Sequence, residues 1–211
     1  PYGVDYKDAT NRSIKGDVEL HYLKPAFKEI YRVLKPDTYG VCFYGYTRIG
    51  EFMEAWTAAG FRIVGHLVFE KHYASNRRRS HTERRHENAY LLAKGRPAFP
   101  AQPFCDVQSW GRYTGNKLHP TQKPVEPFVR MIEAYCPEGG RVLEPFSGSG
   151  TTLEAAVRTC RRFTGIELDP QHFATGQARL EGIKTNLPKP KKRPQPVLRS
   201  HRATPRLRIA A

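Results

Sequence analysis

Apolar and polar positions follow one another along the chain in a pattern that predicts alternating helices and short strands. Apolar residues three and four positions apart indicate amphipathic helices, and short runs rich in aromatic and β-branched residues indicate strands. The helices are expected near residues 23–34, 49–59 and 125–135, and the strands near 39–44, 61–69 and 87–93. Gly60 is expected to end the second helix. This order of elements is typical of an α/β fold.

The C-terminal part of the pattern predicts a β-α-β unit. A short apolar run, Arg141–Glu144, ends on an acid and is followed by a loop with two glycines. A helix is expected from Thr151, and the apolar run after it leads to Glu167. A last helix is expected over about 171–181, with Asp169 as its N-cap and Pro170 at its first position.

The residues of this unit indicate a nucleoside-binding site. Gly148 and Gly150 allow a ligand to approach the backbone closely, and Glu167 has the spacing of an acid that accepts ribose hydroxyls. The loop carries Glu144 and no lysine, which argues against a phosphate and favours a cationic or neutral nucleoside. S-adenosylmethionine fits, since its sulfonium is positive and it has no phosphate. The alternatives are a tight turn that only packs and a solvated acid at the end of a strand.

Charge points to a polyanionic partner. The formal net charge of the 211 residues is +15, and nucleic acid is the first candidate for such a chain. Nine of these charges follow Gly182, in a segment rich in Pro, Lys and Arg with no periodic pattern, which we expect to be disordered. Residues 71–86 form a second basic segment, which is expected either to contact DNA or to be a solvated loop. Trp110 is expected either to touch DNA or to pack onto the body.

Cysteine spacing and hydropathy argue against a zinc-binding or redox protein, a membrane-spanning protein and a secreted protein. The four cysteines have neither the spacing of a zinc knuckle nor that of a redox motif, so no metal is expected. The histidines near the basic segment show no ligand spacing. No apolar run approaches the length of a membrane span and no secretory signal is visible, so a reducing, cytoplasmic setting without membrane association is expected.

Three motifs together resemble a known family. His119-Pro120-Thr121-Gln122-Lys123-Pro124 precedes Glu144-Pro145-Phe146-Ser147-Gly148-Ser149-Gly150-Thr151-Thr152 by about twenty residues, and Pro1-Tyr2-Gly3-Val4-Asp5-Tyr6 opens the chain. Over roughly residues 1–181 the sequence resembles the beta group of amino-methylating DNA methyltransferases, in which the catalytic motif comes before the cofactor motifs. The resemblance implies a Rossmann-like, S-adenosylmethionine-dependent methyltransferase fold with a mostly parallel sheet.

The resemblance also implies roles for individual residues. The catalytic motif corresponds to Pro1 and Tyr2, of which the tyrosine gives a flipped base an aromatic face to lie on. The cofactor-binding residues are expected to be His119, Thr121, Lys123, Glu144, Pro145, Phe146, Gly148, Gly150, Thr151, Thr152 and Glu167. The DNA-binding residues are expected to be Arg77, Arg78, Arg79, Arg84 and Arg85.

The predicted reaction is methyl transfer from S-adenosylmethionine to an exocyclic amine in double-stranded DNA. Adenine N6 is favoured over cytosine N4, because the Pro1–Tyr6 stretch looks more like the adenine enzymes. The main rival is an inactive nucleic-acid-binding fragment, since the family's leading acceptor and first proline are not present before Pro1. An RNA or small-molecule methyltransferase is a third reading, and a homodimer or a restriction endonuclease partner is left open.

The expected domain organisation has two parts. Residues 1–182 form the methyltransferase domain, incomplete at its N-terminus, with a DNA-contacting insertion at about 71–118. Residues 183–211 form the basic, proline-rich tail.

Overall fold

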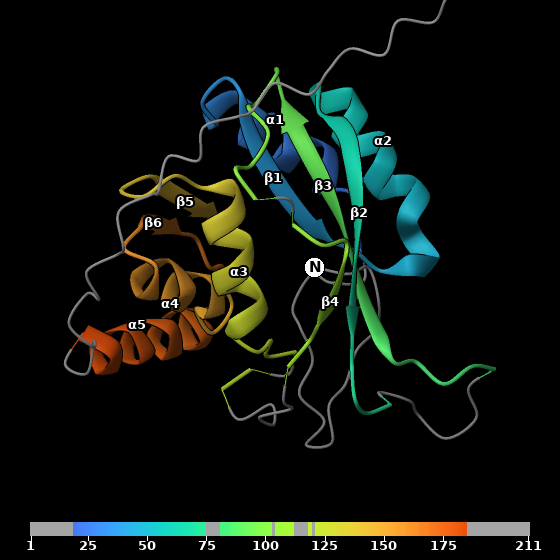
Figure 1. Ribbon diagram of the computed structural model, residues 1–211. Helices are drawn as coiled ribbons and strands as arrows, with labels where there is room; N and C mark the ends of the chain where they lie inside the picture. Colours follow the sequence, from blue (N-terminus) through green and yellow to red (C-terminus); the bar gives the residue numbers. More distant parts are fainter. Residues whose placement is uncertain (1–18, 75–80, 103, 112–117, 120, 185–211) are drawn as a thin grey trace, which may run out of the picture.

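Figure 1 shows the computed structural model, which describes residues 19–74, 81–102, 104–111, 118–119 and 121–184. The first part of the chain contains α1 (Leu23–Val33), β1 (Thr38–Phe43), the short 3-10 helix η1 (Tyr46–Arg48), α2 (Ile49–Ala59), β2 (Arg62–Glu70), β3 (His86–Lys94) and β4 (Val107–Ser109). The second part contains α3 (Glu126–Tyr135), β5 (Arg141–Glu144), α4 (Thr151–Arg158), β6 (Arg162–Gly165) and α5 (Pro170–Lys184). Every helix and strand expected from the sequence is present, and β4 is an additional strand within the expected insertion at about 71–118.

The described strands form a four-stranded sheet in the order β1-β3-β2-β4 and a separate pair, β5-β6. β3 is antiparallel to both of its neighbours, whereas β2-β4 and β5-β6 are parallel. The expectation of a mostly parallel sheet is therefore corrected to a mixed one. The physical reason is that the chain reverses between β2 and β3, and adjacent strands joined by a reversal must run in opposite directions.

Helices cover both faces of the four-stranded sheet. On one face α1 and α2 bury an aromatic cluster that includes Phe27, Phe52 and Trp56, of which the last two are almost completely buried. On the other face Phe69 and Ala89 pack against α3, and Trp110 lies in the same cluster with 4% of its surface exposed. Of the two expectations for Trp110, the structure supports packing onto the body.

Local signals at the helix ends behave as expected. Gly60 has a φ of 103°, a left-handed conformation that ends α2 and that a residue with a Cβ rarely adopts. The Asp169 carboxylate accepts hydrogen bonds from the backbone N–H groups of Gln171 and His172, at 2.8 and 3.1 Å, which confirms it as the cap of α5.

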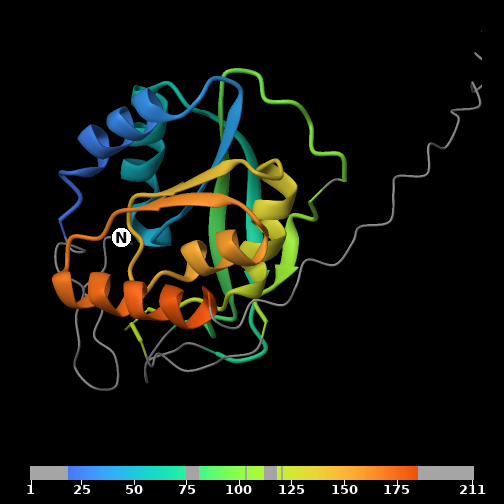
Figure 2. The same cartoon turned by 90° about the vertical axis from the view of Figure 1, so that its left-hand side faces the viewer.

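The N-terminal and C-terminal helices lie at opposite ends of the molecule (Figure 1 and Figure 2). In both Figure 1 and Figure 2, α1 and α2 lie at the top and α5 lies at the bottom, below the β5-β6 pair. Among the residues that the structure describes, no helix has the length and apolar character needed to cross a membrane.

Candidate functional site

Parallel pairing of β5 with β6 brings two acids to the same edge of the strands. Glu144 ends β5 and pairs in register with Gly165, the last residue of β6. Ile166 N–H donates to the Glu144 carbonyl oxygen at 2.9 Å, and Ser147 N–H donates to the Ile166 carbonyl oxygen at 2.9 Å. These bonds extend the pairing one residue beyond the strands, so Glu167 lies beside the loop that follows Glu144.

The glycines of this loop are required by its backbone. Gly148 and Gly150 have φ values of 50° and 80°, in the left-handed region. A Cβ on Gly150 would also lie 3.4 Å from the Cα of Gly176 on α5. At Gly165 a Cβ would come within 2.5 Å of Leu153 on α4, so this glycine allows the helix to pack closely on the strand.

Glu144 is partly buried at the base of the loop. Its carboxylate accepts hydrogen bonds from the Phe146 backbone N–H at 3.2 Å and from the Thr152 hydroxyl at 2.8 Å. Removal from water raises the pKa of Glu144 above its ordinary value, although these hydrogen bonds and nearby Lys123 act in the opposite direction. Glu144 therefore holds the loop in shape, and its burial disfavours the charged form of its carboxyl group.

Glu167 spans the loop instead of lying beneath it. One carboxylate oxygen accepts from Gly148 N–H at 2.7 Å, and the other accepts from Asp169 N–H at 3.0 Å. Each carboxylate oxygen has more than one lone pair, so both oxygens can still accept a hydroxyl from a ligand. Ile166 and Leu168, on either side of this acid in the sequence, are 55 and 81% exposed, and Phe146 in the loop is 40% exposed.

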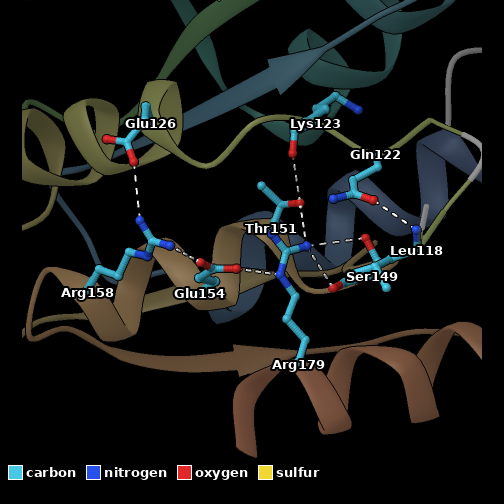
Figure 3. Close-up of polar contacts among 9 residues, drawn as sticks. All are labelled: Leu118, Gln122, Lys123, Glu126, Ser149, Thr151, Glu154, Arg158 and Arg179. Carbon is cyan, nitrogen blue, oxygen red and sulfur yellow. Dashed lines mark hydrogen bonds and ion pairs between the residues drawn. The ribbon is translucent and has the colours of Figure 1, made fainter. Parts of the chain in front are cut away.

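The segment containing His119, Thr121 and Lys123 lies against the same loop. The buried His119 accepts from Thr121 N–H through Nδ1 at 3.2 Å, and a Cβ on Gly148 would lie 3.5 Å from its ring. The Thr151 hydroxyl donates to the Lys123 carbonyl oxygen at 3.2 Å (Figure 3). The Lys123 ammonium lies 5.6 Å from the centre of the Phe43 ring, at the end of β1.

The structure thus brings together three segments that are far apart in the sequence. These are the segment around His119, the loop from Glu144 to Thr152, and Glu167. A pocket of about 270 Å³ adjoins the loop. Its lining includes Ser147, Gly148, Phe163, Gly165, Phe173 and Gly176.

The expected catalytic and DNA-binding residues are only partly visible. Pro1 and Tyr2, and also Arg77, Arg78 and Arg79, lie outside the described residues. Arg84 and Arg85 are described, and both are exposed between β2 and β3. The Arg84 guanidinium lies 5.0 Å from the centre of the Tyr46 ring and donates to its hydroxyl at 2.8 Å.

Several residues of the site were not expected from the sequence. The Tyr46 ring lies beside the Arg84 guanidinium, and the ring centres of His172 and His119 are 4.2 Å apart. Arg179 and Glu154 form an ion pair beneath the glycine loop. In the sequence these residues stand out only by lying on a helix or at the end of an element. That position does not show which residue of another element each one contacts.

Comparisons with known proteins agree with this geometry. A family model described as DNA methylase matches residues 1–178. YubD of Escherichia coli (strain K12), a methylase by name, is 48% identical over 183 residues, which are 87% of this chain and 79% of that protein.

Solved structures show the same architecture. The crystal structure of the M1.HpyAVI–SAM complex is similar with a TM-score of 0.62 and 25% identity, over 73% of this chain and 79% of that one. PvuII DNA methyltransferase, which is cytosine-N4-specific, has a TM-score of 0.64 at 16% identity, over 82% of this chain and 75% of that one, a likeness of fold alone.

Proposed function

The chain belongs to the DNA methylase family, and from this premise we propose that it transfers a methyl group to the N6 amine of adenine in double-stranded DNA. The cofactor is S-adenosylmethionine, which supplies an electrophilic methyl group when bound. The family includes enzymes for adenine N6 and for cytosine N4. The choice of adenine rests on the resemblance of the Pro1–Tyr6 stretch to the adenine enzymes.

The chemistry of the site fits this cofactor. S-adenosylmethionine is a sulfonium cation without phosphate, and the loop that would hold it contains Glu144 and no lysine. The left-handed Gly148 is only partly buried, and the Glu167 carboxylate sits across the loop with acceptor capacity remaining. This pairing of an acid with an open glycine backbone is the observation that carries the proposal.

We assign the cofactor's parts to residues by their positions. Glu167 accepts the ribose hydroxyls, and the apolar Phe146, with Pro145 beside it, covers the base. Gly148 allows close approach, Gly150 lets α5 pack against the loop, and Glu144 and Thr152 fix the loop from below. His119, Thr121 and Lys123, tied to the loop through Thr151, lie toward the methionine end.

DNA is proposed to approach the edge that carries Arg84 and Arg85. The contact with the exposed Tyr46 ring and its hydroxyl orders the Arg84 side chain before DNA binds. Arg77, Arg78 and Arg79 belong to the same connection between β2 and β3 and would add phosphate contacts. Tyr2 is proposed to give the flipped base its stacking face.

The test is methyl transfer followed by identification of the product. Unmethylated double-stranded DNA is incubated with the full chain and methyl-labelled S-adenosylmethionine, digested to nucleosides and analysed by mass spectrometry. We expect labelled N6-methyladenine. Labelled N4-methylcytosine would contradict adenine as the target base and would still agree with the DNA methylase family. Label found in RNA alone would contradict DNA as the substrate. A homodimer and an endonuclease partner stay predictions, to be tested by sedimentation and by copurification.

A further inference from the structure

One face of α5 contacts the candidate site at three points. His172, Gly176 and Arg179 are four and three positions apart, a spacing that places them on the same side of a helix. His172 lies against His119, and Gly176 lies against the backbone of Gly148 and Gly150. The third contact, that of Arg179, is the most extensive.

Arg179 joins α5 to both the glycine loop and α4. Its guanidinium forms an ion pair with Glu154, and the two side chains are only 10 and 8% exposed. A second nitrogen donates to the Ser149 carbonyl oxygen and to the Thr151 hydroxyl oxygen, both at 3.1 Å (Figure 3). Because the Thr151 hydroxyl in turn donates to the Lys123 carbonyl oxygen, the chain of bonds extends to the segment after His119.

Arg179 is not needed merely to neutralise the charge of Glu154, because a second arginine pairs with the same carboxylate. Arg158, one turn further along α4, forms its own ion pair with Glu154 and is 45% exposed. It also donates to Glu126 on α3 at 3.2 Å, and within the described part of the chain its side chain forms no hydrogen bond with the glycine loop. Two arginines thus share one carboxylate, and they differ in that Arg179 also binds Ser149 and Thr151.

We infer that Arg179 is a positioning residue for S-adenosylmethionine, which holds the glycine loop and, through Thr151, the Lys123 segment in the shape that receives the cofactor. The inference rests on the cofactor assignment of the proposed function. A planar guanidinium can serve a carboxylate and two other acceptors at once, because its donors form a rigid fork. A lysine at this position keeps the charge opposite Glu154 but has no such fork.

The experiment compares two matched substitutions, Arg179→Lys and Arg158→Lys, in the full chain. Cofactor affinity is measured by titration calorimetry with S-adenosylmethionine, and hydrogen exchange is measured on peptides covering residues 145–152. For Arg179→Lys we expect binding weaker by roughly tenfold or more, the scale of a lost hydrogen bond to a charged group. Exchange should accelerate in 145–152 and stay unchanged in β2 and β3. Arg158→Lys should change neither measurement.

The two readouts separate the possible failures. Equal loss of affinity in both variants would mean that neutralising Glu154 is all that matters, and would overturn the inference. Wild-type affinity and exchange in Arg179→Lys would overturn it too. If the unsubstituted chain does not bind S-adenosylmethionine, the cofactor assignment fails, and the exchange data still decide whether Arg179 holds the loop.

Discussion

At the scale of single residues, the two acids at the strand ends have different surroundings. Glu144 is desolvated below the loop, where Thr152 and the Phe146 N–H hold it, and its pKa is raised. Glu167 lies across the loop and accepts two backbone N–H groups. We therefore assign loop structure to Glu144 and ligand contact to Glu167, although both follow a strand in the sequence.

The raised pKa of Glu144 predicts a pH-dependent stability. Because the folded chain holds this proton more tightly than the unfolded chain, the contribution of Glu144 to stability falls as pH rises from the ordinary value of 4.5 through the folded value. Glu144→Gln should remove that fall, so that the variant gains stability relative to wild type between pH 4 and pH 8. Thermal unfolding across this range measures it, with exposed Glu133→Gln as the control. A constant difference from wild type across the range would contradict the prediction.

Glu167 has the largest expected effect on the ligand. Glu167→Ala removes an acceptor from the proposed ribose contact and from Gly148, and should weaken S-adenosylmethionine binding by about 1–3 kcal/mol. Calorimetry provides the measurement. Asp169→Ala is the control, because it removes a neighbouring acid that caps the first turn of α5. Unchanged affinity in Glu167→Ala would show that the assignment is wrong.

At the scale of elements, local patterns predicted local structure. The faces of α1 and α2, the end of α2 at Gly60 and the cap of α5 at Asp169 each depend on residues close in sequence, and each is confirmed. The three-residue β4 pairs with β2 about forty positions away, and too few of its residues are apolar to reveal it. Arg179 was missed for the same reason, since its partners lie 25 to 30 positions earlier.

The β2-β3 connection is anchored by a partly buried ion pair between Lys71 and Glu87, whose side chains are 4% and 27% exposed. Glu87→Gln removes this negative charge from beside the buried Lys71 ammonium. We expect this to cost on the order of 1–3 kcal/mol in the free energy of unfolding. Glu54→Gln breaks the exposed Lys24–Glu54 pair and should cost less than about 1 kcal/mol. Urea denaturation compares the two, and equal losses would contradict the difference in burial.

At the scale of the whole molecule, positive charge is distributed between the tail and the body. Neutralising Arg77, Arg78 and Arg79 together should lower DNA affinity and reduce the salt dependence by roughly one unit of slope per lost phosphate contact. S-adenosylmethionine binding should not change. Filter binding at several salt concentrations measures the slope.

The control for that experiment removes the same charge elsewhere. Lys24, Lys28 and Arg32 are exposed on α1, at the end of the molecule opposite α5 (Figure 1). If their neutralisation reduces the slope as much, the effect depends on net charge and the basic segment has no special role.

The separation of the β5-β6 pair from the four-stranded sheet has a consequence for the order of folding. Arg141 pairs with Arg162, 21 positions further on, whereas Thr38 pairs with Lys94, 56 positions further on. Loop-closure entropy alone favours the shorter closure by roughly fourfold in probability. The contiguous stretch from β5 through α5 can therefore assemble as an early kinetic unit. In pulse-labelled refolding, its amides should gain protection before those of β1, so a recognisable nucleoside pocket would precede the completed sheet.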